Sequence, residues 1–228
     1  MSCVTPLRLH KGLAEQGPHI APNAHTLSEA FARHPADAST VGFVLSRLPR
    51  GTAPVLWVQD RLSRKEAGRP ALAAMRADRP VIMVDLSRAM DVLWAMEDGL
   101  RCRSLGAVIG EIWGDPPGLD FTATKRLALR AEAGDLPCWL IRRAASPDLS
   151  AARERWRIAS IPSVPHPHDP QAPGAPRWAL DLFRARHTRP GQWVASYDRA
   201  TDRVDLAAPV RDRAVDARDG TARERTAG

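Results

Sequence analysis

Four short apolar runs recur at intervals through the middle of the chain. They occupy residues 55–58, 81–84, 107–110 and 138–141, and polar or turn-forming residues flank each of them. Within a run, apolar and polar residues do not alternate. Continuous apolar runs of this length are typical of strands that are buried on both faces, as in a parallel sheet. The pattern therefore predicts four parallel strands.

The segments between these runs have the periodicity of helices. Apolar residues at three-to-four spacing predict a helix over 86–102, with Glu97 as the polar member of the stripe and Trp94 in the core. A second helix is predicted over 121–133, and Gly134 follows it where a left-handed glycine commonly ends a helix. Alternating strands and helices predict right-handed crossovers and a sheet covered on both faces.

The pattern changes in the last third of the chain. Residues 178–182 and 193–197 alternate at period two, and a further short strand is predicted over 204–207. The segment 162–176 carries six prolines and is predicted to be an extended loop. The expected fold class is α/β: a mostly parallel central sheet flanked by helices, with a C-terminal antiparallel β extension.

Composition sets the expected domain organisation. Residues 1–23 are predicted to form a flexible arm, 24–208 one domain, and 209–228 a disordered charged tail. No apolar run is long enough for a transmembrane helix, and the first residues lack the apolar core of a secretory signal. Three widely spaced cysteines favour a reducing cytoplasm over a disulfide scaffold or zinc finger.

The chain is basic, with a net charge of +7, and only three of its 33 basic residues are lysine. Arginine suits phosphate and carboxylate pairing, so the charge favours nucleic acid or an acidic protein as partner. A basic surface that only faces solvent is the alternative.

A phosphate-binding loop is missing from a chain that otherwise has the pattern of a nucleotide-binding protein. Such a loop needs Gly-x-x-x-x-Gly-Lys-Ser/Thr, because glycine amides surround the phosphate and the lysine meets its charge. The three lysines are Lys11, Lys65 and Lys125, and none follows a glycine. The sequence therefore favours a protein that works by binding partners.

Four long strings, at 91–102, 105–114, 119–129 and 149–160, resemble the ImuA proteins, which are distant relatives of RecA. The resemblance covers about residues 24–208. It implies a RecA-like fold and an accessory role in SOS-induced, error-prone translesion DNA synthesis. It further implies a cytoplasmic, nucleoid-associated location. The partners that it implies are an ImuB-type Y-family polymerase homologue and an error-prone replicative-type polymerase. RecA and DNA are further candidate partners, and no membrane is expected.

The resemblance also locates a degenerate nucleotide site. Leu27–Phe31 matches the strand before the RecA-type loop, so residues 33–40 occupy the loop position. Ser39 and Thr40 persist, but Ala38 replaces the lysine and Asp37 adds negative charge. Glu111 ends a predicted strand where a RecA-like protein places its magnesium-linked acid. We expect no cofactor, no metal and no catalytic residue here.

The position of the water-activating glutamate departs from the RecA pattern as well. It should follow Val58, where the chain has Gln59 and then Asp60. A non-enzymatic protein is therefore expected. The alternatives are a weak RecA-like ATPase with a rebuilt phosphate site and a SulA-like cell-division inhibitor.

Basic and aromatic residues in the second half of the chain are the candidates for binding partners or nucleic acid. Arginine interleaved with tryptophan fits single-stranded nucleic acid or a protein interface, while a solvated face with the tryptophans in the core is the third reading. The candidates are Arg142, Arg143, Arg153, Arg155, Arg157, Arg184, Arg186, Trp178 and Trp193.

Overall fold

The computed structural model describes residues 25–71, 79–198, 201 and 203–207. The predicted arm at 1–23 and the predicted tail at 209–228 lie outside the described residues. The single domain expected over 24–208 stays a prediction.

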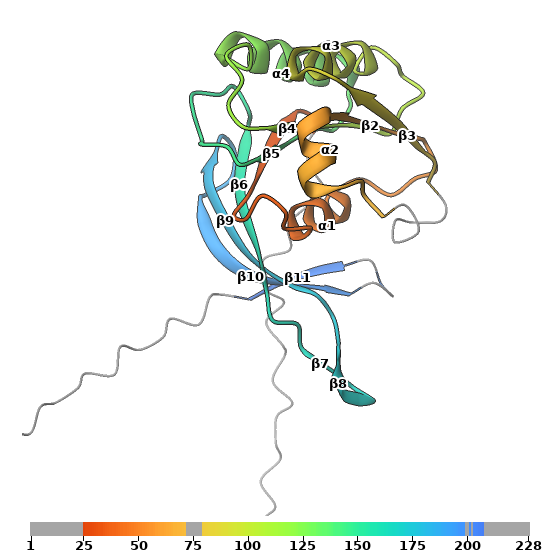
Figure 1. Ribbon diagram of the computed structural model, residues 1–228, viewed down its shortest axis with the longest axis vertical. Coiled ribbons are helices and arrows are strands. Elements are labelled where there is room, and N and C mark those ends of the chain that lie inside the picture. Colours follow the sequence, from red (N-terminus) through yellow and green to blue (C-terminus); the bar gives the residue numbers. More distant parts are fainter. Residues whose placement is uncertain (1–24, 72–78, 199–200, 202, 208–228) are drawn as a thin grey trace, which may run out of the picture.

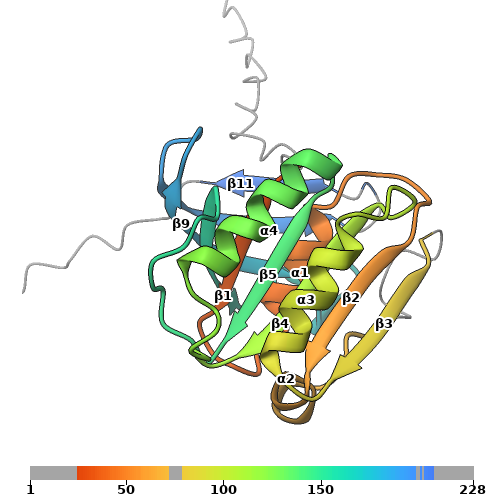
Figure 2. The same ribbon diagram turned by 90° about the horizontal axis from the view of Figure 1, so that it is seen from above.

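A nine-stranded sheet forms the centre of the fold, as Figure 2 shows. From one edge to the other, its strands are β11 (Arg203–Ala207), β10 (Gly191–Asp198), β9 (Arg177–Ala185), β6 (Glu154–Ile161), β1 (Leu27–Ala32), β5 (Cys138–Arg143), β4 (Ala107–Trp113), β2 (Val55–Asp60) and β3 (Val81–Leu86). The six strands from β6 to β3 are parallel, and β9, β10 and β11 pair antiparallel. The predicted fold class is confirmed, and the arrangement is consistent with a RecA-like protein.

Helices cover both faces of the parallel part of the sheet. Helices α3 (Ala89–Gly99) and α4 (Phe121–Gly134) lie together on one side, and α1 (Ser39–Ser46) and α2 (Arg61–Ala67) lie on the other (Figure 1). Among the described residues, no helix combines the length and the apolar character needed to span a membrane. Because both faces are covered, the strands carry the continuous apolar runs from which they were predicted.

Two apolar cores result, one on each face of the sheet. On the α1 face, Phe43 contacts the rings of Trp139, Trp156 and Trp178 at centroid distances of 6.0, 5.1 and 6.2 Å. On the α3 and α4 face, Leu93 and other residues of these helices pack against the sheet. The α1 core extends under the antiparallel strands, so the C-terminal extension and the parallel sheet share one apolar layer.

Helix α3 corrects one sequence prediction and explains another feature. Trp94 is 54% exposed rather than part of the core, because Val92, Leu93 and Met96 already fill the face that meets the sheet. Glu97 interrupts the apolar stripe, yet it is buried. Its carboxylate accepts hydrogen bonds from Arg126 Nε at 2.9 Å and Arg130 Nε at 3.2 Å, so it joins α3 to α4.

The end of α4 also differs from the prediction. Gly134 is the last helical residue, and the left-handed position belongs to Asp135, with a φ of 53°. A Cβ on Gly134 would lie 2.5 Å from the carbonyl oxygen of Leu100. Glycine is therefore required for the close approach of two backbones and not for the turn.

Strand β6 has no counterpart in the predicted elements. It pairs parallel with β1 and antiparallel with β9, so it joins the two halves of the sheet. The proline-rich segment, predicted to be a loop, contains a small hairpin of β7 (Pro165–His166) and β8 (Asp169–Pro173) that projects from the body (Figure 1). Two strands this short tolerate proline because few backbone amides are needed for pairing.

Candidate functional site

The loop at the carboxyl end of β1 replaces a phosphate-binding loop. As predicted, a strand precedes it, and residues 33–38 then lead into α1, which begins at Ser39. Open α/β sheets place ligands at the carboxyl ends of their strands, so this is the position where a nucleotide phosphate would be expected. The loop contains no glycine.

A buried arginine fills the space that this loop encloses. Arg143, at the end of β5, donates from Nε to Glu111, and from Nη1 to the carbonyl oxygens of Pro35 at 2.5 Å and Asp37 at 3.2 Å. The side chains of Arg143 and Glu111 are only 3% and 1% exposed. One guanidinium therefore links the degenerate loop to the acid on β4.

These contacts reverse the polarity that phosphate binding needs. A phosphate-binding loop directs backbone N–H groups at the ligand. Here two carbonyl oxygens of the loop point inward and accept hydrogen bonds from Arg143. An incoming phosphate would meet acceptors and would have to displace a buried cation from its carboxylate partner, which is unfavourable on both counts.

The carboxylate of Asp37 also occupies a position that a phosphate would need, at the start of α1. Its carboxylate accepts hydrogen bonds from Ser39 N at 2.8 Å, from Ser160 N at 2.8 Å and from Ser160 Oγ at 3.0 Å. Burial raises the pKa of this carboxyl, but the hydrogen bonds from Ser160 and Ser39 outweigh burial and lower the pKa below its ordinary value. The Asp37 carboxylate thus accepts a hydrogen bond from the backbone amide of Ser39, which a phosphate bound at the start of α1 would need as a donor.

Glu111 is satisfied from several sides. Its Oε2 accepts from Gln59 Nε2 at 2.6 Å and from Trp57 Nε1 at 3.3 Å, while Arg143 takes Oε1. Strand β4 continues to Trp113, so Glu111 lies within the strand and not at its end as predicted. In the described ranges, no group of three or more His, Cys, Asp or Glu residues could hold a metal ion.

The residues near the position of a water-activating acid have structural partners. Asp60 caps α2 by accepting from Ser63 N at 2.6 Å, and its second oxygen accepts from Trp113 N at 3.1 Å. Gln59 donates to Glu111 and to the carbonyl of Gly68. Neither side chain is directed at a free phosphate position.

A cavity of 330 Å³ remains beside this site, between α1 and residues 67–71. Two of its lining residues are basic. Arg143 is neutralised by Glu111, and Arg69 forms an ion pair with Asp85 on β3. In the described part of the lining, no basic side chain is left to neutralise a phosphate.

Four of the predicted binding residues are buried, so the expectation that they lie at the surface is wrong for them. Arg142 pairs with Asp115 at 2.6 Å, and Arg155 pairs with Glu29 at 2.6 Å. Arg143 fills the degenerate site, and Trp178 belongs to the core. The sequence does not reveal these partners because each carboxylate lies on a different strand or loop.

Arginine and phenylalanine side chains alternate on the face of β1, β6 and β9 that carries Glu29. Arg155 lies over the rings of Phe31 and Phe183 at 5.3 and 5.2 Å, and Arg157 lies 4.1 Å from the centroid of Phe183. Arginine above a ring is attracted by the negative charge of its face, so this cluster stabilises the junction between the parallel and antiparallel strands.

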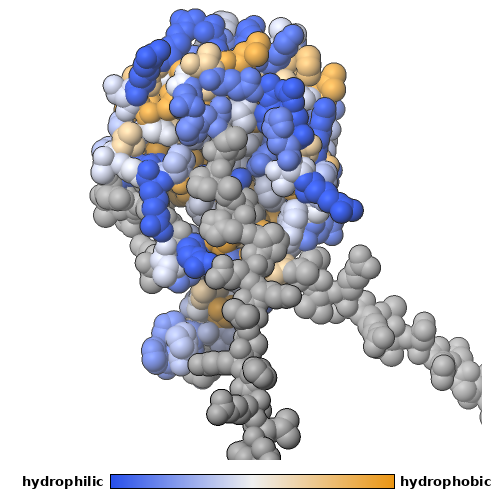
Figure 3. Space-filling view, turned by 180° about the vertical axis from the view of Figure 1, so that it is seen from behind, coloured by the Kyte–Doolittle hydropathy of each residue, from blue (hydrophilic) through white to orange (hydrophobic). Residues whose placement is uncertain are grey.

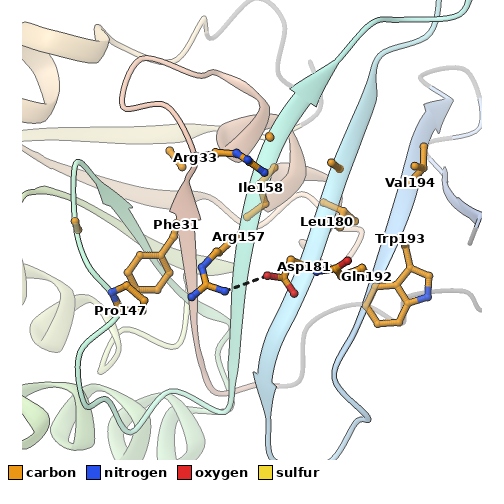
Figure 4. A pocket seen from close by; sticks show the side chains of 14 residues that line it. Phe31, Arg33, Pro147, Arg157, Ile158, Leu180, Asp181, Gln192, Trp193 and Val194 are labelled. Atoms are coloured by element: carbon orange, nitrogen blue, oxygen red, sulfur yellow. Dashed lines mark hydrogen bonds and ion pairs between the residues drawn. The ribbon is translucent and has the colours of Figure 1, made fainter. Parts of the chain in front are cut away.

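Arg157 and Trp193 line a hollow of 410 Å³ over β1, β6, β9 and β10 (Figure 4). Arg157 on β6 donates to Asp181, its direct neighbour on β9, at 3.0 Å, as the dashed line in Figure 4 shows. The hollow thus contains an internally paired arginine beside Phe31 and Pro147. Sequence analysis did not identify Phe31 or Asp181, because both acquire this position only when β1 and β9 flank β6.

The remaining candidates line a second groove, which we call the α4–β9 groove. It has a volume of 400 Å³ and is formed by the outer face of α4, residues 150–153, and residues 184–186 at the end of β9. Arg153, Arg184 and Arg186 all lie here, so the structure brings three of the nine predicted residues together. Phe121, Lys125 and Leu129 also line the groove and were not among the predicted residues, although their four-residue spacing places them on one face of a helix.

Comparison with known proteins identifies the family. No protein-family model matches the chain. Protein ImuA from two strains of Caulobacter vibrioides (NA1000 / CB15N and ATCC 19089 / CIP 103742 / CB 15) is 32% identical over 185 residues, which cover 75% of this chain and 72% of the relative. This similarity shows that the chain belongs to the ImuA family.

Proposed function

We propose that the protein is a non-enzymatic accessory factor of damage-induced, error-prone translesion DNA synthesis, and that it acts by binding partner proteins. Membership of the ImuA family supports a role in damage-induced mutagenesis. The partners that we propose are an ImuB-type Y-family polymerase homologue and an error-prone replicative-type polymerase, with RecA and DNA as further candidates. The proposed place of action is the cytoplasm, at the nucleoid.

The buried pair of Arg143 and Glu111 is the observation that carries the non-enzymatic part of the proposal. A triphosphate with magnesium would need backbone donors, a free cation and an acid that is free to reach the metal. Here the carbonyls of Pro35 and Asp37 face the site. The cation, Arg143, is already paired, and the acid, Glu111, already accepts hydrogen bonds from three side chains. The fold can still present surface side chains to partner proteins.

Nucleotide binding is tested by thermal unfolding in an ATP and magnesium titration, with RecA as the positive control. A ligand that binds only the folded state raises its stability, so binding near millimolar ATP would raise the melting temperature by several degrees. We expect no change for this protein. A clear rise would overturn the proposal in favour of a rebuilt phosphate site.

Partner binding is tested by pull-down with purified ImuB-type protein and RecA, together with damage-induced mutation frequency in a strain that lacks this gene. We expect the ImuB-type protein to be captured and the mutation frequency to be restored by the intact gene. Capture of neither protein would overturn the proposal. Filamentous growth on overexpression, without any effect on mutation, would favour a division inhibitor.

A further inference from the structure

The α4–β9 groove has a basic wall. Of the residues that line it, Lys125, Arg153, Arg184 and Arg186 are basic and none is acidic. Arg153 is paired with Glu132 at 2.7 Å. Lys125 and Arg184 form no salt bridge with any described residue, and both are exposed. The groove therefore carries positive charge that the described part of the chain does not neutralise.

The floor and one edge of the same groove are apolar. Phe121 and Leu129 are 42% and 52% exposed, although the inner face of α4 already supplies Leu127 and Ala131 to the core. Ala128 and Ala185 also line the groove, and their small side chains leave it open. Figure 3 shows hydrophobic residues interspersed with hydrophilic ones on the upper part of the molecule, where α3 and α4 lie. An exposed apolar area with a charged rim is typical of a binding site.

The spacing of these residues fits a peptide better than a nucleic acid. Single-stranded nucleic acid binds by stacking its bases on successive aromatic side chains. Phe121 is the only aromatic residue in the groove lining as described, and the floor is formed by small aliphatic side chains. Aliphatic side chains of a peptide would fill such a floor, and acidic side chains would meet the basic wall.

We infer that the α4–β9 groove binds an acidic amphipathic segment of a partner protein. Its Glu or Asp side chains would pair with Lys125, Arg184 and Arg186, and its apolar side chains would pack on Phe121 and Leu129. This inference rests on the proposed function only in that the partner is a protein. Complementary charge would mainly set the rate of encounter and the choice of partner, and apolar contact would add affinity.

The test uses the full chain and a set of fluorescein-labelled amphipathic peptides of Leu, Phe and Glu. About 14 residues give a helix of about 21 Å. Binding is measured by fluorescence anisotropy at about 0.15 M salt, where exposed charges are screened beyond roughly 8 Å. We expect at least one acidic peptide to bind with Kd below about 100 μM. Peptides with Lys in place of Glu should not bind.

The variants Lys125→Glu/Arg184→Glu and Leu129→Asp test the groove itself. We expect the double charge reversal to weaken peptide binding by about tenfold or more. Arg61→Glu is the control for a single reversal, because Arg61 is exposed at the start of α2, on the opposite side of the sheet, and undergoes the same substitution as Arg184 with half the charge change of the double variant. It should leave binding within about twofold.

Three results would overturn the inference. They are no acidic peptide bound by the intact chain, equal weakening by Arg61→Glu and by the groove variant, and tighter, groove-dependent binding of an oligo-dT probe. The failure of the proposed function is distinguishable from these. If the intact chain captures the ImuB-type protein while no peptide binds, the accessory role stands and the groove is excluded.

Discussion

Arg143 reaches Glu111 diagonally across two adjacent parallel strands. Glu111 on β4 is directly paired with Ile141 on β5, and Arg143 follows two residues later on the same face of the sheet. Its guanidinium extends from there to the carbonyl oxygens of the loop after β1. One ion pair thus connects three segments, and it lies where a nucleotide-binding relative would leave room for phosphate and metal.

Removal of Arg143 should destabilise the protein strongly. In Arg143→Met, the carboxylate of Glu111 loses its cation while it stays buried, and we expect the free energy of unfolding to fall by about 3–5 kcal/mol. Urea unfolding measures this. Arg101→Met is the control, because Arg101 is 61% exposed in its pair with Asp98 and should change stability by less than about 1 kcal/mol. Equal losses in the two variants would show that the buried pair is not a structural element.

Asp37 should make stability depend on acid pH. The pKa of its carboxyl is lowered from 3.8 in the folded state, so the charged form favours folding. This contribution is complete above the unfolded pKa and is lost as pH falls through and below 3.8. The free energy of unfolding of the intact chain, less that of Asp37→Asn, should therefore be constant above about pH 5 and shrink below pH 3.8.

Ser160→Ala gives the second arm of this test. It removes the hydroxyl donor at 3.0 Å but keeps the backbone donor at 2.8 Å. We expect the acid-dependent part of stability to decrease without disappearing. If the difference between the intact chain and Asp37→Asn does not vary between pH 7 and pH 3, Asp37 does not stabilise the loop through its charge.

Gly134→Ala should destabilise the protein, contrary to helix propensity. Alanine in place of a helical glycine usually gains up to about 1 kcal/mol. Here the new Cβ would meet the carbonyl oxygen of Leu100 at 2.5 Å, and a backbone atom cannot rotate away. We expect a net loss of about 1–3 kcal/mol in the free energy of unfolding, measured with urea.

Ala133→Gly is the control for that substitution. Ala133 is exposed in the same turn of α4, so propensity alone should apply, and we expect a loss of about 1 kcal/mol. A gain of stability in Gly134→Ala would mean that α3 and α4 do not approach as closely as the structure has them.

The two described cysteines should differ sharply in thiol reactivity. Cys102 is exposed, whereas Cys138 is fully buried in β5 and burial raises the pKa of its thiol. Because the thiolate is the reactive form, only Cys102 should react with Ellman's reagent in folded Cys3→Ser protein. Cys138 should react after unfolding in guanidinium. Rapid labelling of folded Cys3→Ser/Cys102→Ser protein would contradict the burial of β5.

Period-two alternation predicted β9, β10 and β11, and the continuous apolar runs predicted β2, β3, β4 and β5, because a strand covered on both faces has few alternatives to a continuous apolar sequence. They failed for β6. Its Arg155 and Arg157 were predicted to bind a partner or nucleic acid at the surface, yet Arg155 is buried because Glu29 on β1 lies beside it at 2.6 Å. The two residues are 126 positions apart, and local periodicity carries no information about such a pair.

Helix α3 shows the same limit for an apolar residue. Periodicity located the helix, but the width of its buried face depends on how close the neighbouring elements pack. Leu93 and Met96 fill that face, and Trp94 extends into solvent. At Gly134, the sequence indicated the end of the helix to within one residue, while the reason for glycine lies in Leu100, the residue that follows α3.

The sequence by itself determined the α/β class, the positions of most strands and of helices α3 and α4, and the loss of a phosphate-binding loop, because these depend on local residue pattern. Only the tertiary structure decided that Arg143 neutralises Glu111 beside the residues that replace this loop, and which arginines remain exposed for a partner. A charged side chain is buried or exposed according to whether a distant carboxylate is brought within reach, and the arrangement of strands, helices and loops in space controls that distance.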